Sequence, residues 1–201
     1  MSKILKWILI IIGLGGALFI GYVLYIGLTF SFPFDDGKFY STKDLVDNYN
    51  AKTEEINELK RYVNTVISAN KSVDIEFDGN KRLRIFHVFD NGVNDSNWDL
   101  NISSSKVDAL LEKLGWTRQT LKTLKEKLNA ANCISIKNGE PCNIGFQRSG
   151  MGKYYYNIFD KPVPDSLKSS YNDSCTYILY GDKVVLEYGG GAIGPQCFPT
   201  K

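Results

Sequence analysis

The fold is decided by the stretch Val73-Asp74-Ile75-Glu76-Phe77-Asp78-Gly79-Asn80-Lys81-Arg82-Leu83-Arg84-Ile85-Phe86-His87-Val88-Phe89. Apolar and polar residues alternate strictly from Val73 to Phe77, which is the period of a strand with one buried face. Asp78-Gly79-Asn80 is a turn signal, and a second strand pattern returns from Leu83 to Phe89. The stretch therefore predicts an antiparallel β-hairpin.

Further strands and two helices are expected on the C-terminal side of this hairpin. One helix runs from Ser105, with Asp108 completing a capping box, to Gly115, and a second runs from Thr117 to Ala131. Strand patterns occur at Trp98–Ile102, Cys133–Lys137, Asn143–Gln147, Tyr154–Phe159, Thr176–Tyr180 and Val184–Tyr188. The pattern predicts an α+β domain, an antiparallel sheet with a helical pair on one face.

A long helix is expected before the hairpin. Ser41 and Asp44 have the spacing of a loose capping box, and apolar residues keep helical spacing from there to about Ser68. We therefore divide the chain into residues 1–30, 31–70 and 71–201. They are a cytoplasmic tip with a transmembrane anchor, an exit segment with a juxtamembrane helix, and a disulfide-bonded α+β extracytoplasmic domain.

The anchor is the uncharged run from Trp7 to Phe34. A helix needs about 20 apolar residues to cross a hydrocarbon core about 30 Å thick. Lys3 and Lys6 precede the run and Asp35 is the first charge after it, so we expect a cytoplasmic N-terminus. The alternative is a cleaved signal peptide, whose apolar region is shorter and ends in small residues. The sequence favours a single retained span.

Small residues recur along one face of this span. Gly13, Ala17 and Gly21 are four residues apart, a spacing that lets two membrane helices pack closely. Glycine and alanine are also common in membrane helices without dimerisation. The ridge is therefore a hypothesis for a homodimer contact.

The four cysteines lie on the side predicted to be exported. Cys133, Cys142, Cys175 and Cys197 form an even set in an oxidising compartment, which predicts two disulfides. We expect Cys175 with Cys197 and Cys133 with Cys142, and the other two pairings stay open. If Asn138-Gly139 forms a tight turn, Cys133 and Cys142 are out of register.

The charge balance bears on the class of partner. The chain has 24 Lys and Arg and 22 Asp and Glu. Lys3 and Lys6 precede the span, so 22 of each remain in residues 31–201 and their formal charge is zero. A nucleic-acid partner would require a concentrated basic surface, so we expect none.

The most distinctive candidate for ligand binding is the glycine run near the C-terminus. We assign Glu187, Tyr188, Gly189, Gly190 and Gly191 to a candidate binding segment, because successive glycines allow close approach of the backbone to another group. The alternative is a tight return that lets Cys197 reach its partner.

Three other motifs are weaker. Gly145 to Lys153 lacks the spacing and the hydroxyl of a phosphate loop. Asp90 to Asp99 is rich in oxygen ligands but breaks the calcium-loop pattern at Gly92 and Asp95. His87 is the only histidine, and no nucleophile motif accompanies it. We expect no metal and no cofactor.

These features favour a non-catalytic binding domain anchored in a bacterial cell envelope. The sequence does not identify its ligand, and a protein partner or a homodimer is one possibility. The alternatives are an envelope hydrolase that uses carboxylates such as Asp99 or Glu187, and an assembly factor that dimerises through its membrane helix. No paired carboxylate motif supports the hydrolase.

Overall fold

The computed structural model describes residues 16, 18–23, 38–190 and 193–199. The chain divides into two compact units, Met1–Asp36 and Gly37–Lys201, which we describe separately. In the first unit, the described residues are helical and solvent-exposed. A search of the described residues finds no helix with the length and apolar character needed to span a membrane. Most of the predicted span, including Gly13 and Ala17, lies outside those residues, whereas Gly21 lies inside them.

The second unit begins with two helices where the sequence predicts one. Ser41 caps α2 (Thr42–Ala51) through a capping box with Asp44, as expected. The helix breaks at Lys52 and continues as α3 (Thr53–Val66). The Thr53 hydroxyl donates to the Tyr49 carbonyl at 2.6 Å, and back-bonding of this kind bends helices.

Both of these helices contribute side chains to the core of the domain. Four of their apolar side chains are fully buried in one cluster with the sheet: Leu45, Ile56, Leu59 and Val63. The juxtamembrane segment predicted for residues 31–70 therefore belongs, from Gly37 onward, to the same compact unit as the sheet.

The nine strands form one antiparallel sheet. Their bounds are β1 Lys71–Asp78, β2 Arg82–Asp90, β3 Val93–Asp95, β4 Trp98–Asn101, β5 Ser135–Lys137, β6 Cys142–Ser149, β7 Gly152–Ile158, β8 Tyr177–Tyr180 and β9 Val184–Gly189. The order is β3-β2-β1-β5-β6-β7-β9-β8, with β4 also paired to β2. The predicted hairpin is β1 and β2, and β3 is a short strand within the oxygen-rich stretch from Asp90 to Asp99.

Two further helices connect the halves of the sheet. Helix α4 (Ser105–Leu114) is capped by Ser104, one residue earlier than predicted, and ends at Gly115 in the left-handed conformation. Helix α5 (Arg118–Ala130) is capped by Thr117 and packs beside α3. The helical layer is thus larger than the predicted pair. A four-residue helix, α6 (Asp165–Lys168), lies in the connection before β8.

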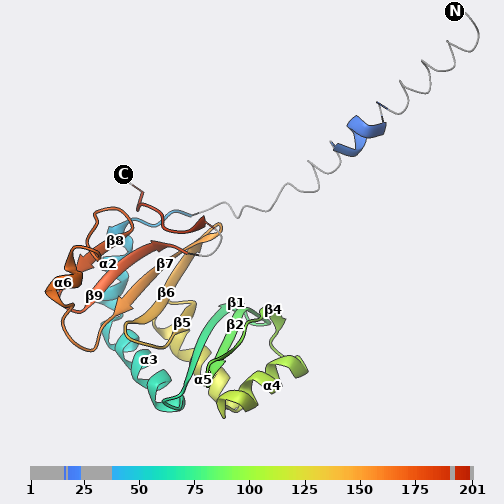
Figure 1. Ribbon diagram of the computed structural model, residues 1–201, viewed down its shortest axis with the longest axis horizontal. Helices are drawn as coiled ribbons and strands as arrows, with labels where there is room; N and C mark the ends of the chain where they lie inside the picture. Colours follow the sequence, from blue (N-terminus) through green and yellow to red (C-terminus); the bar gives the residue numbers. More distant parts are fainter. Residues whose placement is uncertain (1–15, 17, 24–37, 191–192, 200–201) are drawn as a thin grey trace, which may run out of the picture. The chain divides into compact units, whose positions relative to one another are not determined.

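The two faces of the sheet differ in what covers them. Side chains such as Ile75, Phe86, Ile144 and Tyr156 point into one core with helices α2 to α5. In Figure 1, α2, α3 and α5 lie along one side of the strands. We call the opposite side the open face. The connection from Phe159 covers its β8–β9 end through a second, smaller cluster.

One of the two predicted disulfides is present. Cys175 and Cys197 are bonded, with their Cα atoms 4.2 Å apart. The prediction for Cys133 and Cys142 is wrong, because both are buried free thiols. Cys133 precedes β5. Lys137 pairs with Asn143, so Cys142 lies opposite Asn138, the residue after β5. About five residues of extended chain, roughly 15 Å, separate them, beyond the reach of a disulfide.

Candidate functional site: the open face of the sheet

A row of side chains crosses the middle of the open face. Strand pairing sets Glu76 opposite Ser135, Ser135 opposite Gly145, Gly145 opposite Tyr155, and Tyr155 opposite Glu187. These positions come from β1, β5, β6, β7 and β9. Residues that are far apart in the chain therefore become neighbours on one surface.

A buried charge cluster lies at the centre of this row. Glu76 is only 1% exposed and Lys153 only 3%. Lys153 Nζ donates to Glu76 Oε2 at 2.9 Å and to Ser135 Oγ at 2.9 Å. Arg148 donates through Nε to Glu76 Oε1 and through Nη2 to Oε2, the latter at 2.9 Å. We call Glu76, Ser135, Arg148 and Lys153 the Glu76 cluster.

The cluster holds Glu76 in its ionised form. Burial by itself would raise the pKa of this carboxyl. The hydrogen bond from Arg148 and the charge of Lys153 outweigh burial, so the pKa of Glu76 lies below its ordinary value. A third cation, Arg84, lies farther from Glu76, at 3.6 Å, and also pairs with Asp78.

Two glycines make room for this arrangement. A Cβ atom at Gly145 would lie 2.0 Å from Ser135 Oγ and 3.0 Å from Lys153 Cδ. A Cβ atom at Gly190, where φ is +86°, would lie 2.8 Å from the Tyr155 hydroxyl. The glycine run thus packs against the Tyr155 side chain, whose ring lies 4.7 Å from Lys153 Nζ.

The structure separates the predicted binding residues Glu187 and Tyr188. Glu187 is on the open face, where Asn157 Nδ2 donates to Glu187 Oε2 at 2.8 Å and Asn143 Nδ2 donates to Asn157 Oδ1 at 2.7 Å. Tyr188 points into the core and stacks on Tyr154, with ring centroids 4.1 Å apart. Neighbouring strand residues face opposite sides, so one ligand cannot contact both side chains.

The described glycines of the run also close the C-terminal return. Gly189 has φ of +145° and bridges to Pro195. A Cβ atom there would lie 2.6 Å from the Gly194 carbonyl oxygen. This packing agrees with the structural alternative, a tight return toward Cys197. Gly191 lies outside the described residues.

Exposed aromatic side chains border the open face on β2 and β4. Trp98 is 61% exposed and Phe89 is 45% exposed. The His87 ring contacts Trp98 edge-on, with centroids 4.8 Å apart. We call His87, Phe89 and Trp98 the aromatic rim. His87 and Phe89 share a face because they are two residues apart on β2, whereas the exposure of Phe89 follows from the tertiary structure.

A small cavity of about 140 Å³ adjoins the aromatic rim, and Asp74, His87, Phe89 and Lys137 contribute to its lining. Burial lowers the pKa of His87, partly opposed by the charge of Asp74. His87 Nε2 is buried and has no hydrogen-bond partner in the described part of the chain. The imidazole is therefore neutral near pH 7.

The two carboxylates named for the hydrolase alternative, Asp99 and Glu187, lie on different strands. Asp99 is on β4 and forms an exposed ion pair with Arg82 at 3.3 Å. Glu187 is on β9, and β2, β1, β5, β6 and β7 separate the two strands. Within residues 38–190 and 193–199, no three His, Cys, Asp or Glu side chains are grouped to hold a metal ion.

The free thiols are not placed for nucleophilic chemistry. Burial raises the pKa of Cys133, and it raises the pKa of Cys142 to about 12. A thiol of this kind stays protonated at neutral pH, whereas the thiolate is the nucleophile.

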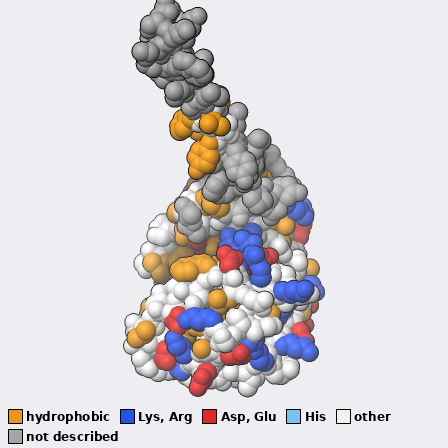
Figure 2. Space-filling model, turned by 90° about the vertical axis from the view of Figure 1, so that its right-hand side faces the viewer, with side chains coloured by type: hydrophobic (Ala, Val, Ile, Leu, Met, Phe, Trp, Pro, Cys, Tyr) orange, Lys and Arg blue, Asp and Glu red, His pale blue; other side chains and the backbone are white. Residues whose placement is uncertain are grey.

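Lys and Arg side chains on the molecular face of Figure 2 are interspersed with Asp and Glu rather than gathered into one basic patch.

Comparison of the chain with protein-family models found no match, and searches of curated proteins and of solved structures matched none either. Functional inference therefore rests on the geometry of the described residues.

Proposed function

We propose that this chain is a membrane-anchored extracytoplasmic binding protein of a bacterial cell envelope, and that the open face binds a protein partner. The uncharged run from Trp7 to Phe34 supports anchoring. The described residues 18–23 support membrane anchoring further, since they form a helix whose apolar side chains are exposed. The Cys175–Cys197 disulfide supports an oxidising compartment.

The observation that carries the binding proposal is the aromatic rim beside the Glu76 cluster. Trp and Arg are enriched among the hot spots of protein interfaces, and the strand register sets Trp98 and Glu76 on either side of Ile85. Their strands are held in the sheet, and the charges beside them are fixed by the hydrogen bonds of the Glu76 cluster. A partner would therefore bind a surface that is already ordered, which limits the entropic cost of association.

The test is site-specific photo-crosslinking of the full-length chain in cells that naturally express it. A photo-reactive phenylalanine analogue replaces Phe89 or Trp98 in separate variants. The matched control replaces Leu167, which is 42% exposed but lies in α6, away from the aromatic rim. We expect one discrete crosslinked protein from the Phe89 and Trp98 positions and none from Leu167. Absence of that product, or the same product from all three positions, would contradict the proposal.

Self-association through the membrane helix is a separate proposal. Gly13, Ala17 and Gly21 support it by their four-residue spacing. An Ala17→Ile variant should lower self-association in a membrane two-hybrid assay, because added bulk prevents close helix packing. Unchanged self-association would contradict this helix contact, but it would not bear on the proposal that the open face binds a protein partner.

A further inference from the structure

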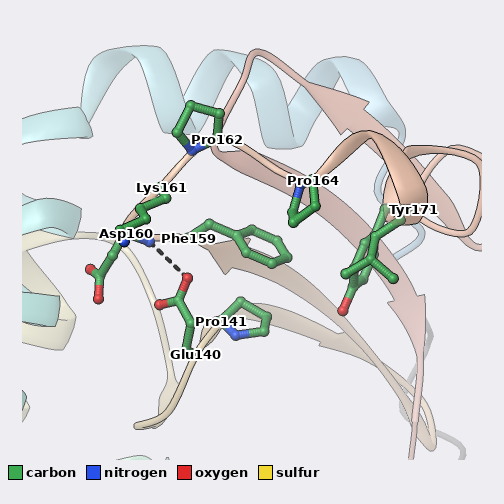
Figure 3. Close-up of a pocket in the computed structure, with 9 residues that line it drawn as sticks. Glu140, Pro141, Phe159, Asp160, Lys161, Pro162, Pro164 and Tyr171 are labelled. Carbon is green, nitrogen blue, oxygen red and sulfur yellow. Dashed lines mark hydrogen bonds between the residues drawn. The ribbon is translucent and has the colours of Figure 1, made fainter.

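A second candidate site lies at the end of the sheet where β6 begins and β7 ends. A pocket of about 490 Å³ is formed there by the β5–β6 loop and the connection through α6. This volume is in the range of roughly 300–1,000 Å³ that is usual for small-ligand sites. Figure 3 shows Pro141, Phe159, Pro164 and Tyr171 around a common space, with Glu140 and Asp160 toward one end.

The walls of the pocket are apolar and fixed in place. The Phe159 and Tyr171 rings meet nearly at right angles, with centroids 5.3 Å apart, and so form two walls of a corner. The N–H of Phe159 donates to the Lys183 carbonyl at 2.9 Å, and that of Val163 donates to the Asp182 carbonyl at 2.7 Å. These bonds tie the connection to the β8–β9 turn, so the walls are ordered before a ligand arrives.

The polar end of the pocket is organised around a buried lysine. Lys60 of α3 donates to the Ile158 carbonyl at 2.8 Å and pairs with Asp160 at 2.8 Å. Its ammonium group lies 3.9 Å from Glu140 Oε2. The N–H of Asp160 donates to Glu140 Oε1 at 2.9 Å, which fixes the Glu140 side chain. About half of that side chain stays exposed to a ligand.

The charges at this end favour a neutral ligand. Three ammonium groups, those of Lys60, Lys161 and Lys183, lie at this end with the carboxylates of Glu140 and Asp160. Lys60 is bonded to Asp160 and to the Ile158 carbonyl, and Lys183 is bonded to the Asp160 carbonyl. No excess negative charge remains to attract a cation. The two carboxylates in turn disfavour an anion.

The hydrogen-bonding groups narrow the ligand class further. Pro141, Pro162 and Pro164 have no backbone N–H, and the N–H groups of Phe159 and Asp160 are already bonded within the protein. These backbone positions therefore offer no free donor, and the acceptors of the pocket are the carboxylates of Glu140 and Asp160. A proline-rich peptide also presents carbonyl acceptors and lacks donors, so it is a poor match. A sugar carries hydroxyl donors together with C–H faces that pack on aromatic rings.

We propose that this pocket binds a neutral saccharide unit. The sugar face packs against Tyr171, beside the largely buried Phe159 ring, and its hydroxyl groups donate to Glu140 and Asp160 and accept from Lys161. This site is distinct from the open face, so its failure would not affect the proposed protein partner.

The test uses the full-length chain in an amine-oxide detergent, because an alkyl maltoside would itself supply a sugar. Cellobiose, N,N′-diacetylchitobiose and decaproline are titrated separately by saturation-transfer difference NMR. Leu167→Trp fills the pocket, whereas Met151→Trp adds the same bulk on an exposed turn elsewhere. Glu140→Gln removes the charge at nearly constant size, and a thermal scan checks that each variant is folded.

We expect at least one disaccharide to bind with a millimolar Kd. Leu167→Trp and Glu140→Gln should each raise that Kd by about tenfold, and Met151→Trp should leave it within about twofold. Three results would overturn the proposal: no disaccharide binding up to about 50 mM, binding that neither pocket variant weakens, or binding of decaproline alone. If Leu167→Trp fails to fold, Glu140→Gln decides.

Discussion

Lys153 Nζ lies 2.9 Å from Glu76 Oε2, and both side chains are almost fully buried on the side of the sheet opposite the helical layer. The pair joins β7 to β1 across β5 and β6. Burying opposite charges is costly unless each finds its partners, which Arg148 and Ser135 provide here. The buried pair is therefore stable only while Arg148 and Ser135 keep their hydrogen bonds to it.

Replacement of Glu76 should destabilise the domain strongly. Glu76→Gln leaves Lys153 and Arg148 buried without an anion, and breaking a buried pair in this way costs about 3–5 kcal/mol. Urea unfolding followed by tyrosine and tryptophan fluorescence measures the change. The control is Glu126→Gln, an exposed carboxylate 3.9 Å from Lys122, whose effect should stay within about 0.5 kcal/mol. Equal effects of the two variants would contradict the role of the cluster.

The contribution of Glu76 should depend on pH with a defined sign. The pKa of this carboxyl is lowered in the folded protein from an ordinary value of 4.5. Its stabilisation is therefore fully present above about pH 4.5 and is lost as pH falls through the lower, folded-state pKa. The gap in melting temperature between the wild type and Glu76→Gln should narrow below pH 4.5. A gap that widens on acidification would reverse the sign and refute the assignment.

The single histidine offers a direct titration of the open face. His87 should titrate below its ordinary pKa of 6.5, because burial disfavours the charged ring. Asp74→Asn should lower the pKa further, and Lys137→Gln should raise it, since these are the charges that act on the ring together with Lys153. The shift of the one imidazole signal in a ¹H–¹³C NMR titration measures each value. A wild-type pKa at or above 6.5 would show that the ring is not desolvated.

The state of the cysteines can be counted chemically. Without reductant, the folded protein should show no reaction with a maleimide within minutes, because Cys133 and Cys142 are buried and the other two are bonded. In urea without reductant, two thiols should react, as determined by mass spectrometry. Cys175→Ser should cost about 2–4 kcal/mol of stability. If the denatured, unreduced protein has no reactive thiol, Cys133 and Cys142 are bonded to each other and the assignment of free thiols is wrong.

Local patterns in the sequence predicted much of the domain. The alternation from Val73 to Phe77, the cap at Ser41 with Asp44, and Gly115 at the end of α4 each depend on a few neighbouring residues. For that reason they could be recognised without the fold. The bond between Cys175 and Cys197 could also be predicted from the sequence, because the two residues flank one hairpin.

The tertiary structure decided what depends on strand order and register. It set Glu76, Tyr155 and Glu187 in one row, turned the face of Tyr188 toward the helical layer, and separated Cys133 from Cys142. Strand pairing joins positions that are distant in the chain, and a shift of one residue reverses the face of every side chain. Sequence period alone reports which residues share a face, whereas long-range pairing determines which of them meet.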